Sequence, residues 1–252
     1  MSCNLLIDIG NSSAKYAFVT DGIIGDVVRT SYPSLVEKFR TQNLETRVES
    51  AIVSSVAGNP SSVAEALETQ SINVTLLGAD TPLPFQLGYD SPDTLGADRM
   101  AAVAGAMELW PGRNVLVVDA GSCVTYDFLT ADGVYLGGNI APGLRMRLSS
   151  MHEHTALLPM VEPEGPVPPI AYNTDTALRS GALMGLKHEV EGYAVTSREN
   201  IPSSDGRWAV LLTGGDAPLI RPLLDIQVTV EPELVMRGLH YILKYILKCV
   251  GK

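Results

Sequence analysis

Short apolar runs alternate along the chain with amphipathic stretches and polar turns, a pattern that predicts strands interleaved with helices. Leu5–Ile7 is apolar and ends at a turn that begins with Asp8, and Lys15–Val19 resumes the apolar pattern up to a second turn at Asp21-Gly22. Two apolar runs around a tight polar turn are typical of a β-hairpin. The chain is therefore expected to open with a hairpin whose turn carries a carboxylate.

The same pattern returns in the second half of the chain. Leu116–Val118 is apolar, a polar turn begins at Asp119, and Tyr126–Leu129 leads to another turn. An offset of 111 residues superposes four turn residues on four others: Asp8, Gly10, Asp21 and Gly22 on Asp119, Gly121, Asp132 and Gly133. Repetition at about half the chain length indicates a duplicated architecture.

Further helices and strands are predicted between and after the hairpins. Prolines that can occupy a first helical turn favour three of the helices. The expected helices follow Pro33, Pro60 and Pro232 or begin near Leu144 and Asn173-Thr174, and the expected strands are Ala51–Val53, Asn73–Leu77 and Trp208–Leu212. Strands interleaved with helices in both halves predict an α/β protein.

Two further features complete the expected organisation. Pro159–Pro169 is so rich in proline that it should form a surface loop, since proline interrupts helices and central strands. A domain boundary is expected close to Pro111-Gly112, between a helix and the second hairpin. The expected domains are therefore residues 1–112 and 113–252.

The amino-acid composition excludes several classes of protein. The 252 residues include 46% hydrophobic and 18% charged residues, as in ordinary globular proteins. A net charge of −10 without a Lys/Arg-rich run argues against a nucleic-acid partner. Three scattered cysteines favour a reducing cytoplasm, and no segment approaches the roughly 20 apolar residues of a membrane span. The N-terminus also lacks the basic region of a signal peptide.

The two Asp-x-Gly turns are the first candidates for chemistry. Such a turn places a carboxylate beside exposed backbone N–H groups, which can hold phosphate oxygens while the carboxylate reaches a metal ion or its waters. One turn alone is most simply an ordinary hairpin turn. Two matched turns would face each other across a cleft, one at the β-phosphate and one at the γ-phosphate of ATP. This arrangement matches the superfamily of acetate and sugar kinases, Hsp70 and actin, whose fold is ribonuclease H-like.

Several blocks of sequence resemble the type III pantothenate kinases, in the family's order. Asp8-Ile9-Gly10-Asn11-Ser12-Ser13-Ala14-Lys15 is similar to the family's Asp-x-Gly-Asn-Thr-x-x-Lys signature. The other blocks are Tyr89–Arg99, Asp119–Asp127, Gly137–Gly143, Thr155–Pro159, Asn173-Thr174 and Thr213–Ala217. Two departures concern ATP affinity: Ser12 replaces the usual Thr, and Ser122-Cys123 replaces Thr-Ala. Ser122 keeps a hydroxyl for a phosphate contact.

The resemblance implies a nucleotide site and two cation sites. The expected nucleotide contacts are Asp8, Ile9, Gly10, Asn11, Ser12, Ser13, Ala14, Lys15 and Ser122, with magnesium held at Asp8, directly or through water. Asp119 would hold a monovalent cation, potassium or ammonium, although the residues alone leave open a magnesium-water role like that of Asp8. Lys15 could equally be a solvated strand residue.

The resemblance also implies a substrate site. A kinase acting on an alcohol needs a group that takes the hydroxyl proton, and the resemblance makes Asp98 that base. Arg99, with its planar fork, suits the carboxylate of pantothenate. Spacing alone would equally allow Asp98 and Arg99 to be a helix-start acid and a surface ion pair. The remaining expected substrate contacts are Tyr89, Gly96, Ala97 and, from the partner subunit of a homodimer, Thr174.

The function implied by the resemblance is ATP-dependent phosphorylation of pantothenate to 4′-phosphopantothenate, the first step of coenzyme A biosynthesis. One alternative is a non-enzymatic ATP-binding regulator, and another is a kinase of a different small alcohol or sugar. Two other motifs have simpler interpretations. The pair His152 and His154 lacks a third metal ligand and is expected at a solvated helix end, whereas Thr213–Asp216 suits a turn near adenine or ribose.

Overall fold

The computed structural model describes residues 3–41, 44, 47–201 and 208–250, and the chain divides into two compact units. Unit 1 contains Met1–Pro111, Gly133–Tyr135 and Glu233–Lys252. Unit 2 contains Gly112–Asp132 and Leu136–Pro232. The main division lies at the expected Pro111-Gly112 step, but the end of the chain lies with the first unit rather than the second.

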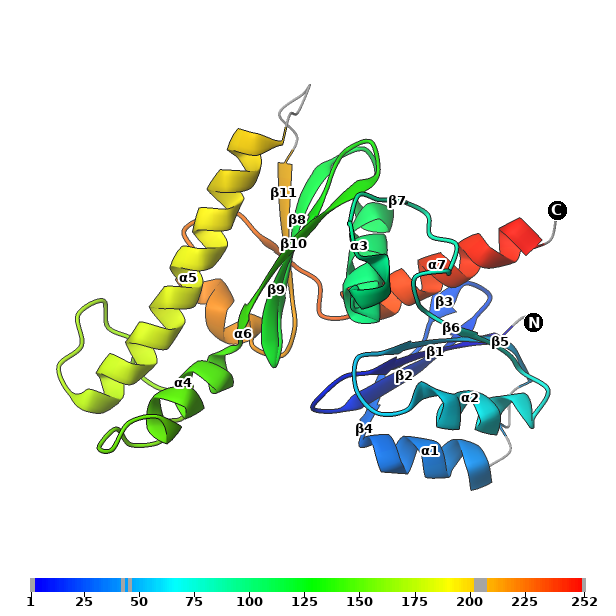
Figure 1. Ribbon diagram of the computed structural model, residues 1–252, viewed down its shortest axis with the longest axis horizontal. Helices are drawn as coiled ribbons and strands as arrows, with labels where there is room; N and C mark the ends of the chain where they lie inside the picture. The colour runs from blue at the N-terminus through cyan, green and yellow to red at the C-terminus, as the bar shows by residue number, and fades with distance from the viewer. Residues whose placement is uncertain (1–2, 42–43, 45–46, 202–207, 251–252) are drawn as a thin grey trace. The chain divides into compact units, whose positions relative to one another are not determined.

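Unit 1 is built on a mixed sheet with the order β3-β2-β1-β5-β6 (Figure 1). Strands β1 and β2 form the antiparallel hairpin, and β5 and β6 run parallel to β1. A short strand, β4, also pairs with β2. The bounds are β1 (Cys3–Ile9), β2 (Ala14–Thr20), β3 (Ile23–Ile24), β4 (Val28–Thr30), β5 (Val48–Ser55) and β6 (Asn73–Leu76).

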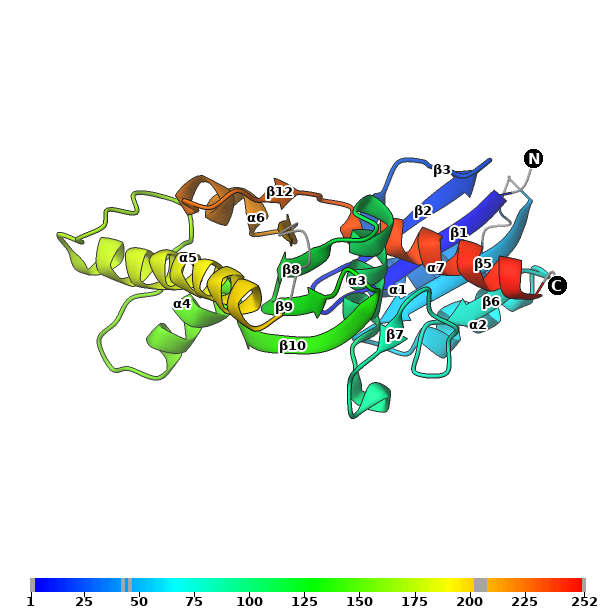
Figure 2. The ribbon, with the colours of Figure 1, turned by 90° about the horizontal axis from the view of Figure 1, so that it is seen from above.

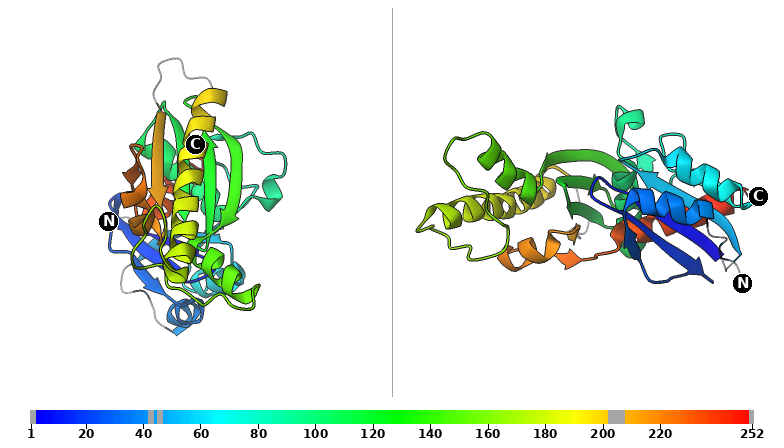
Figure 3. Two further views of the ribbon diagram at one scale, coloured as in Figure 1. Left: turned by 90° about the vertical axis from the view of Figure 1, so that its left-hand side faces the viewer. Right: turned by 90° about the horizontal axis from the view of Figure 1, so that it is seen from below.

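Helices cover both faces of this sheet. The helices α1 (Tyr32–Thr41) and α2 (Pro60–Glu68) lie on one face, where Figure 3 shows them over the strands. Leu5, Ile7 and Ile9 of β1 belong to the hydrophobic cluster that these two helices complete. Because successive side chains of a strand point to opposite faces, Asp8 lies on the other face, toward α3 (Ala97–Leu109) and α7 (Leu234–Val250).

Close packing of α3 on α7 explains why the end of the chain belongs to unit 1 (Figure 2). A Cβ atom on Gly238 would overlap the carbonyl oxygen of Ala101, and one on Gly105 would overlap the carbonyl oxygen of Leu234. The two helices can approach this closely only with glycine at both contacts. Such a long-range contact leaves no signal in local sequence patterns.

Unit 2 contains the second hairpin in a sheet with the order β12-β11-β8-β9-β10. Strands β8 and β9 are antiparallel, and β11 runs parallel to β8. The bounds are β8 (Asn114–Ala120), β9 (Cys123–Leu129), β10 (Val134–Pro142), β11 (Trp208–Thr213) and β12 (Thr229–Val230). The first two residues of β10 lie in unit 1, where they pair with β7 (Gln86–Leu87).

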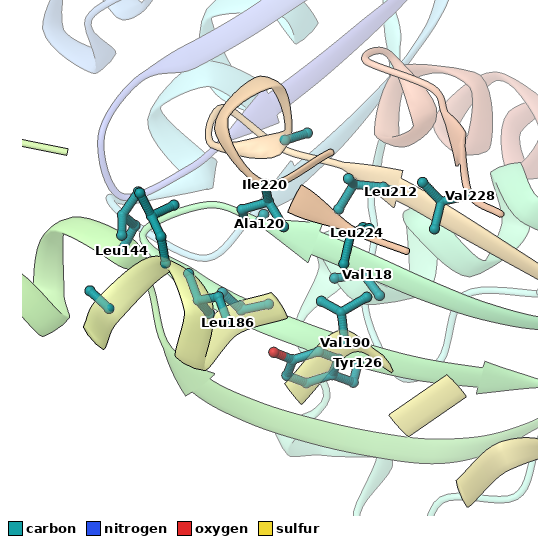
Figure 4. Packing of buried hydrophobic residues seen from close by; sticks show 14 of the residues in the cluster. Val118, Ala120, Tyr126, Leu144, Leu186, Val190, Leu212, Ile220, Leu224 and Val228 are labelled. Carbon is teal, nitrogen blue, oxygen red and sulfur yellow. The ribbon is translucent and has the colours of Figure 1, made fainter. Parts of the chain in front are cut away.

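The core of unit 2 lies between one face of its sheet and α4 (Leu144–Glu153), α5 (Thr174–Asn200) and α6 (Ala217–Ile220). Figure 4 shows Leu186 and Val190 of α5 packed on Val118 and Tyr126 of the sheet. Since Leu116, Val118 and Ala120 face this cluster, Asp119 lies on the opposite face of β8.

The predicted α/β fold is confirmed, as are the two hairpins and the helices expected after Pro33, Pro60 and at Thr174. The proline-rich segment Pro159–Pro169 contains neither helix nor strand. Strand β10 was not predicted, because its exposed and buried positions alternate only partly and it contains two glycines. In the described part of the chain, no helix combines the length and apolar character that crossing a membrane requires.

Candidate active site

The turn of the first hairpin is short and exposed. Residues Gly10–Ser13 join β1 to β2, and the amide of Gly10 donates to the carbonyl oxygen of Ser13 at 3.1 Å. Asn11 and Ser12 are exposed. The turn therefore presents backbone and hydroxyl groups at the end of β1, as a phosphate-binding turn requires.

Asp8 lies beside this turn between two polar neighbours. In the sheet it stands opposite Lys15 of β2 on one side and Ser54 of β5 on the other. Opposite residues of an antiparallel pair share a face, so Lys15 and Asp8 lie on the same side of the sheet. Lys15 is half-buried rather than fully solvated.

Burial and nearby carboxylates make Asp8 an unusual acid. Burial and then the negative charge of Asp98 raise the pKa of Asp8 from 3.8 to about 6, Glu233 adds to the rise, and Ser54 and Lys15 oppose it. Its Oδ1 atom is buried without a hydrogen-bond partner. A desolvated carboxylate oxygen that no donor satisfies is suited to a magnesium ion or a magnesium-bound water.

Asp98 stands in the first turn of α3, where the backbone fixes its carboxylate. Its Oδ1 atom accepts a hydrogen bond from the amide of Arg99 at 2.7 Å. A Cβ atom on Gly96 would lie only 2.5 Å from the same oxygen. Glycine at position 96 therefore leaves the space that the Asp98 carboxylate occupies, and this explains why a glycine stands two residues before Asp98.

Arg99 is buried, with 5% of its surface exposed, so it is not half of a surface ion pair. Its guanidinium carbon lies 6.0 Å from the ring centre of Tyr89, at cation–π distance. Tyr89 in turn lies 6.0 Å from the ring of Tyr135. Unit 1 therefore brings together Asp8, Lys15, Asp98 and Arg99, with Tyr89 against the guanidinium and Ala97 buried at the start of the helix.

The turn of the second hairpin repeats the first in unit 2. The amide of Gly121 donates to the carbonyl oxygen of Cys123 at 3.0 Å, and Ser122 at the tip is exposed. Asp119 stands opposite Thr125 of β9 and Thr213 of β11 in the sheet. This carboxylate therefore has a hydroxyl-bearing residue beside it on each neighbouring strand.

A glycine-rich turn packs against Asp119. Gly214 has a φ of +94°, and a Cβ atom on it would lie 2.5 Å from the Oδ1 atom of Asp119. The amide of Asp216 donates to the carbonyl oxygen of Ala120 at 2.9 Å. The Thr213–Asp216 turn, expected near adenine or ribose, thus lies directly beside the second hairpin.

Three residues around the two sites were not singled out from the sequence. Ser54 and Glu233 act on the pKa of Asp8, and burial raises the pKa of Asp216, which lies beside the second hairpin. Ser54 is an ordinary strand residue in the sequence, and Glu233 is distant from Asp8 along the chain. Asp216 belongs to the Thr213–Asp216 motif, but the sequence pattern did not indicate a role for its side chain.

Thr174 is the remaining expected site residue. It is exposed at the first position of α5, after a capping box in which the Asn173 side chain accepts from the amide of Thr176 at 2.9 Å. The box fixes the start of the helix and leaves Thr174 facing outward. His152 and His154 are exposed at the end of α4, as expected.

The fold is shared with several solved structures. A Baf family transcriptional activator from Campylobacter jejuni superposes with a TM-score of 0.63 at 23% identity, covering 97% of this chain and 99% of that one. MreB5 of Spiroplasma citri bound to ADP superposes with a TM-score of 0.56 at 9% identity, covering 100% and 99%. At these identities the likeness establishes the actin-like fold alone.

Sequence comparison is more specific. The family model for type III pantothenate kinase matches residues 4–196. A type III pantothenate kinase from Porphyromonas gingivalis is 40% identical over 250 residues, which covers 97% of this chain and 99% of the relative. One from Phocaeicola vulgatus is 40% identical over 242 residues, which covers 96% and 98%. With its actin-like fold, its paired hairpins and this match along nearly its whole length, the chain belongs to the type III pantothenate kinases.

Proposed function

We propose that the chain transfers the γ-phosphoryl group of ATP to the primary hydroxyl of pantothenate, with Asp98 as the general base. The product would be 4′-phosphopantothenate, so the reaction opens coenzyme A biosynthesis. The observation that carries this assignment is the carboxylate of Asp98, fixed by the Arg99 amide and by the space at Gly96. The relatives named as type III pantothenate kinases support the choice of substrate.

The proposed reaction divides its work among few side chains. The pantothenate hydroxyl loses its proton to a carboxylate oxygen of Asp98 as its oxygen attacks the γ-phosphorus. The bond from the γ-phosphorus to the β–γ bridging oxygen breaks, and ADP leaves. Arg99 holds the pantothenate carboxylate through its planar fork, and Tyr89 keeps that fork in place from one side.

The nucleotide is proposed to enter as its magnesium complex. In unit 1, the Gly10–Ser13 turn offers backbone and hydroxyl groups for phosphate oxygens, and Lys15 supplies a positive charge beside that turn. In unit 2, the exposed hydroxyl of Ser122 is proposed to contact a phosphate. The unsatisfied Oδ1 atom of Asp8 would accept from a magnesium-bound water or bind the ion itself. The protein would then contribute to catalysis mainly by aligning the phosphate, the hydroxyl and the base. Such alignment is the main contribution of protein groups to phosphoryl transfer.

Asp119 is proposed to hold a monovalent cation. Its neighbours Thr125 and Thr213 provide further oxygen atoms, and Gly214 allows the following turn to approach closely. Activity is expected to rise with potassium or ammonium over sodium, and Asp119→Asn should remove that preference. Initial rates at constant ionic strength measure this. A wild-type enzyme that is indifferent to the cation would return Asp119 to a magnesium-water role.

A homodimer is also proposed, with Thr174 reaching the partner's substrate. Large apolar side chains are exposed in the segment that leads to this residue: Leu157, Ile170 and Tyr172 expose 92%, 87% and 70% of their surface. Exposed apolar residues gathered in one segment are typical of an interaction surface. The purified chain should sediment as a dimer, and Leu157→Asp with Ile170→Asp should weaken the dimer. A wild-type monomer at micromolar concentration would contradict the proposal.

A coupled assay of ADP release tests the substrate directly. The purified chain is given MgATP and potassium with pantothenate, and separately with a panel of sugars and other small alcohols. Turnover only with pantothenate is expected. Turnover with a sugar instead would favour the kinase of another alcohol, and binding of ATP without any turnover would favour the non-enzymatic regulator.

A further inference from the structure

A bidentate ion pair joins α4 and α5 of unit 2. Arg147 of α4 donates through Nη1 to Oε1 of Glu189 in α5 at 2.8 Å and through Nη2 to Oε2 at 2.7 Å. The hydroxyl of Tyr126, which is fully buried in β9, donates to the same Oε2 atom at 3.0 Å. Both carboxylate oxygens of Glu189 are therefore engaged, and the guanidinium plane has one orientation.

The third donor of Arg147 points to the chain before its own helix. Its Nε atom donates to the carbonyl oxygen of Pro142 at 2.8 Å. The next residue, Gly143, donates through its amide to the carbonyl oxygen of Ser122 at 3.2 Å. A continuous series of contacts thus runs from Glu189 through Arg147 and the Pro142-Gly143 step to the tip of the second hairpin.

The contact between Gly143 and the hairpin is close. A Cβ atom on Gly143 would overlap the carbonyl oxygens of Gly121 and Ser122. Movement of the Pro142-Gly143 step would therefore displace the turn that carries Ser122, because no free space separates the two segments. The position of the hairpin tip depends on where this step is held.

The Arg147–Glu189 ion pair is less exposed to solvent than the ion pairs of Arg145, which lies in the same helix. The side chains of Arg147 and Glu189 are 18% and 34% exposed. Arg145, in the same helix, pairs with Glu162 at 3.3 Å and Glu164 at 3.7 Å, and all three side chains are at least 62% exposed. Exposed pairs contribute little, whereas bidentate, partly desolvated pairs fix geometry. Of these two arginines, Arg147 is the one placed to hold a backbone segment.

We propose that Arg147 and Glu189 are positioning residues for nucleotide binding, which act by holding the Pro142-Gly143 step and, through it, Ser122. The inference rests on the proposed phosphate contact of Ser122. Neither side chain is assigned a contact with ATP or pantothenate. Their effect should fall on the affinity for the nucleotide rather than on proton transfer at Asp98, which lies in unit 1.

Conservative variants separate this role from simple charge. Arg147→Lys keeps the positive charge but cannot bind both oxygens of Glu189 and the Pro142 carbonyl together. Glu189→Gln keeps the shape but removes the charge and one of the two oxygens that orient the guanidinium. Arg145→Lys is the matched control, because it makes the same substitution two residues away without touching the step.

The test measures the dissociation constant of MgATP by calorimetry, together with KM for each substrate and kcat. Arg147→Lys and Glu189→Gln are each expected to weaken MgATP binding about tenfold, equivalent to about 1.4 kcal/mol, while KM for pantothenate changes less than twofold. Arg145→Lys should match the wild type. Because calorimetry needs no turnover, this result stands whichever alcohol the enzyme phosphorylates.

Two results would overturn the proposal. One is unchanged MgATP affinity in both folded variants. The other is an equal rise in both KM values together with a lower melting temperature, which indicates general loosening of unit 2. If Arg147→Lys does not fold, Glu189→Gln alone decides, since it leaves Arg147 itself in place and withdraws the charge and one of the two accepting oxygens opposite the guanidinium.

Discussion

Replacing Asp98 with asparagine is expected to lower kcat by about 10²- to 10⁴-fold, the usual contribution of a general base. That loss corresponds to roughly 3 to 5 kcal/mol of transition-state stabilisation. The amide has the shape of the carboxylate and can still accept from the Arg99 amide through its oxygen, so the start of α3 should keep its structure. KM for pantothenate should change little, because the lost interaction is made during proton transfer.

Arg99→Lys provides the contrasting variant in the neighbouring residue. It keeps the charge but loses the planar fork that lies at cation–π distance from Tyr89, so KM for pantothenate should rise while kcat is largely kept. Steady-state kinetics with circular dichroism to verify folding distinguish the two variants. A folded Asp98→Asn enzyme that keeps more than about a tenth of wild-type kcat would remove Asp98 as the base.

Replacing Asp8 with asparagine is expected to lower kcat/KM for MgATP strongly and, at the same time, to stabilise the protein. The activity falls because the unsatisfied Oδ1 atom is the proposed magnesium-facing oxygen. The stability rises because a buried carboxylate with a raised pKa costs free energy when ionised. A shift from 3.8 to about 6 corresponds to about 2 to 3 kcal/mol above pH 6.

The direction of the pH dependence follows from the raised pKa of Asp8. The folded protein binds this proton more tightly than the unfolded chain, so the cost is absent below about pH 3.8 and is complete once the pH has risen past about 6. The melting temperature of Asp8→Asn should therefore exceed that of the wild type at pH 8, and the difference should shrink toward pH 4. In the wild type, kcat/KM for MgATP should fall as the pH drops through about 6.

Thermal melts and pH–rate profiles of the wild type and Asp8→Asn together check both parts. An Asp8→Asn enzyme with near-normal kcat/KM at limiting magnesium would contradict the nucleotide role. A melting temperature below that of the wild type at pH 8 would instead show that the carboxylate is stabilised in the folded protein, contrary to its desolvated position beside Asp98 and Glu233.

Local sequence patterns were sufficient to predict the two hairpins and most of the helices. Asp8 and Asp119 each follow a short apolar run, and a glycine stands two residues after each, so turn chemistry and strand pattern agree. The candidate residues of the two turns follow from this agreement. The resemblance to a known family added the roles proposed for Asp98 and Arg99, which spacing alone could not give.

Contacts between segments that are distant along the chain could not be predicted from local sequence patterns. Arg147 and Glu189 are separated by 42 residues, and each is a residue type that is common on the surface of helices. Ser54 approaches Asp8 only because β5 pairs with β1, and Glu233 approaches it only because the last segment of the chain returns to unit 1. Such approaches depend on strand order and helix packing, which a periodicity of 2 or 3.6 residues does not specify.

The return of the last helix to unit 1 has a consequence for synthesis of the protein. Unit 2 lies between the two main segments of unit 1 along the chain. During translation, the first 111 residues leave the ribosome without α7, and the face of β1 that this helix covers stays open to water. At about 5 to 20 residues per second, the roughly 140 residues from Gly112 to the end of α7 take roughly 7 to 28 s to make. Strand β1 is thus made well before the helix that encloses it, and a nascent chain stalled before Glu233 would expose apolar surface to chaperones and proteases.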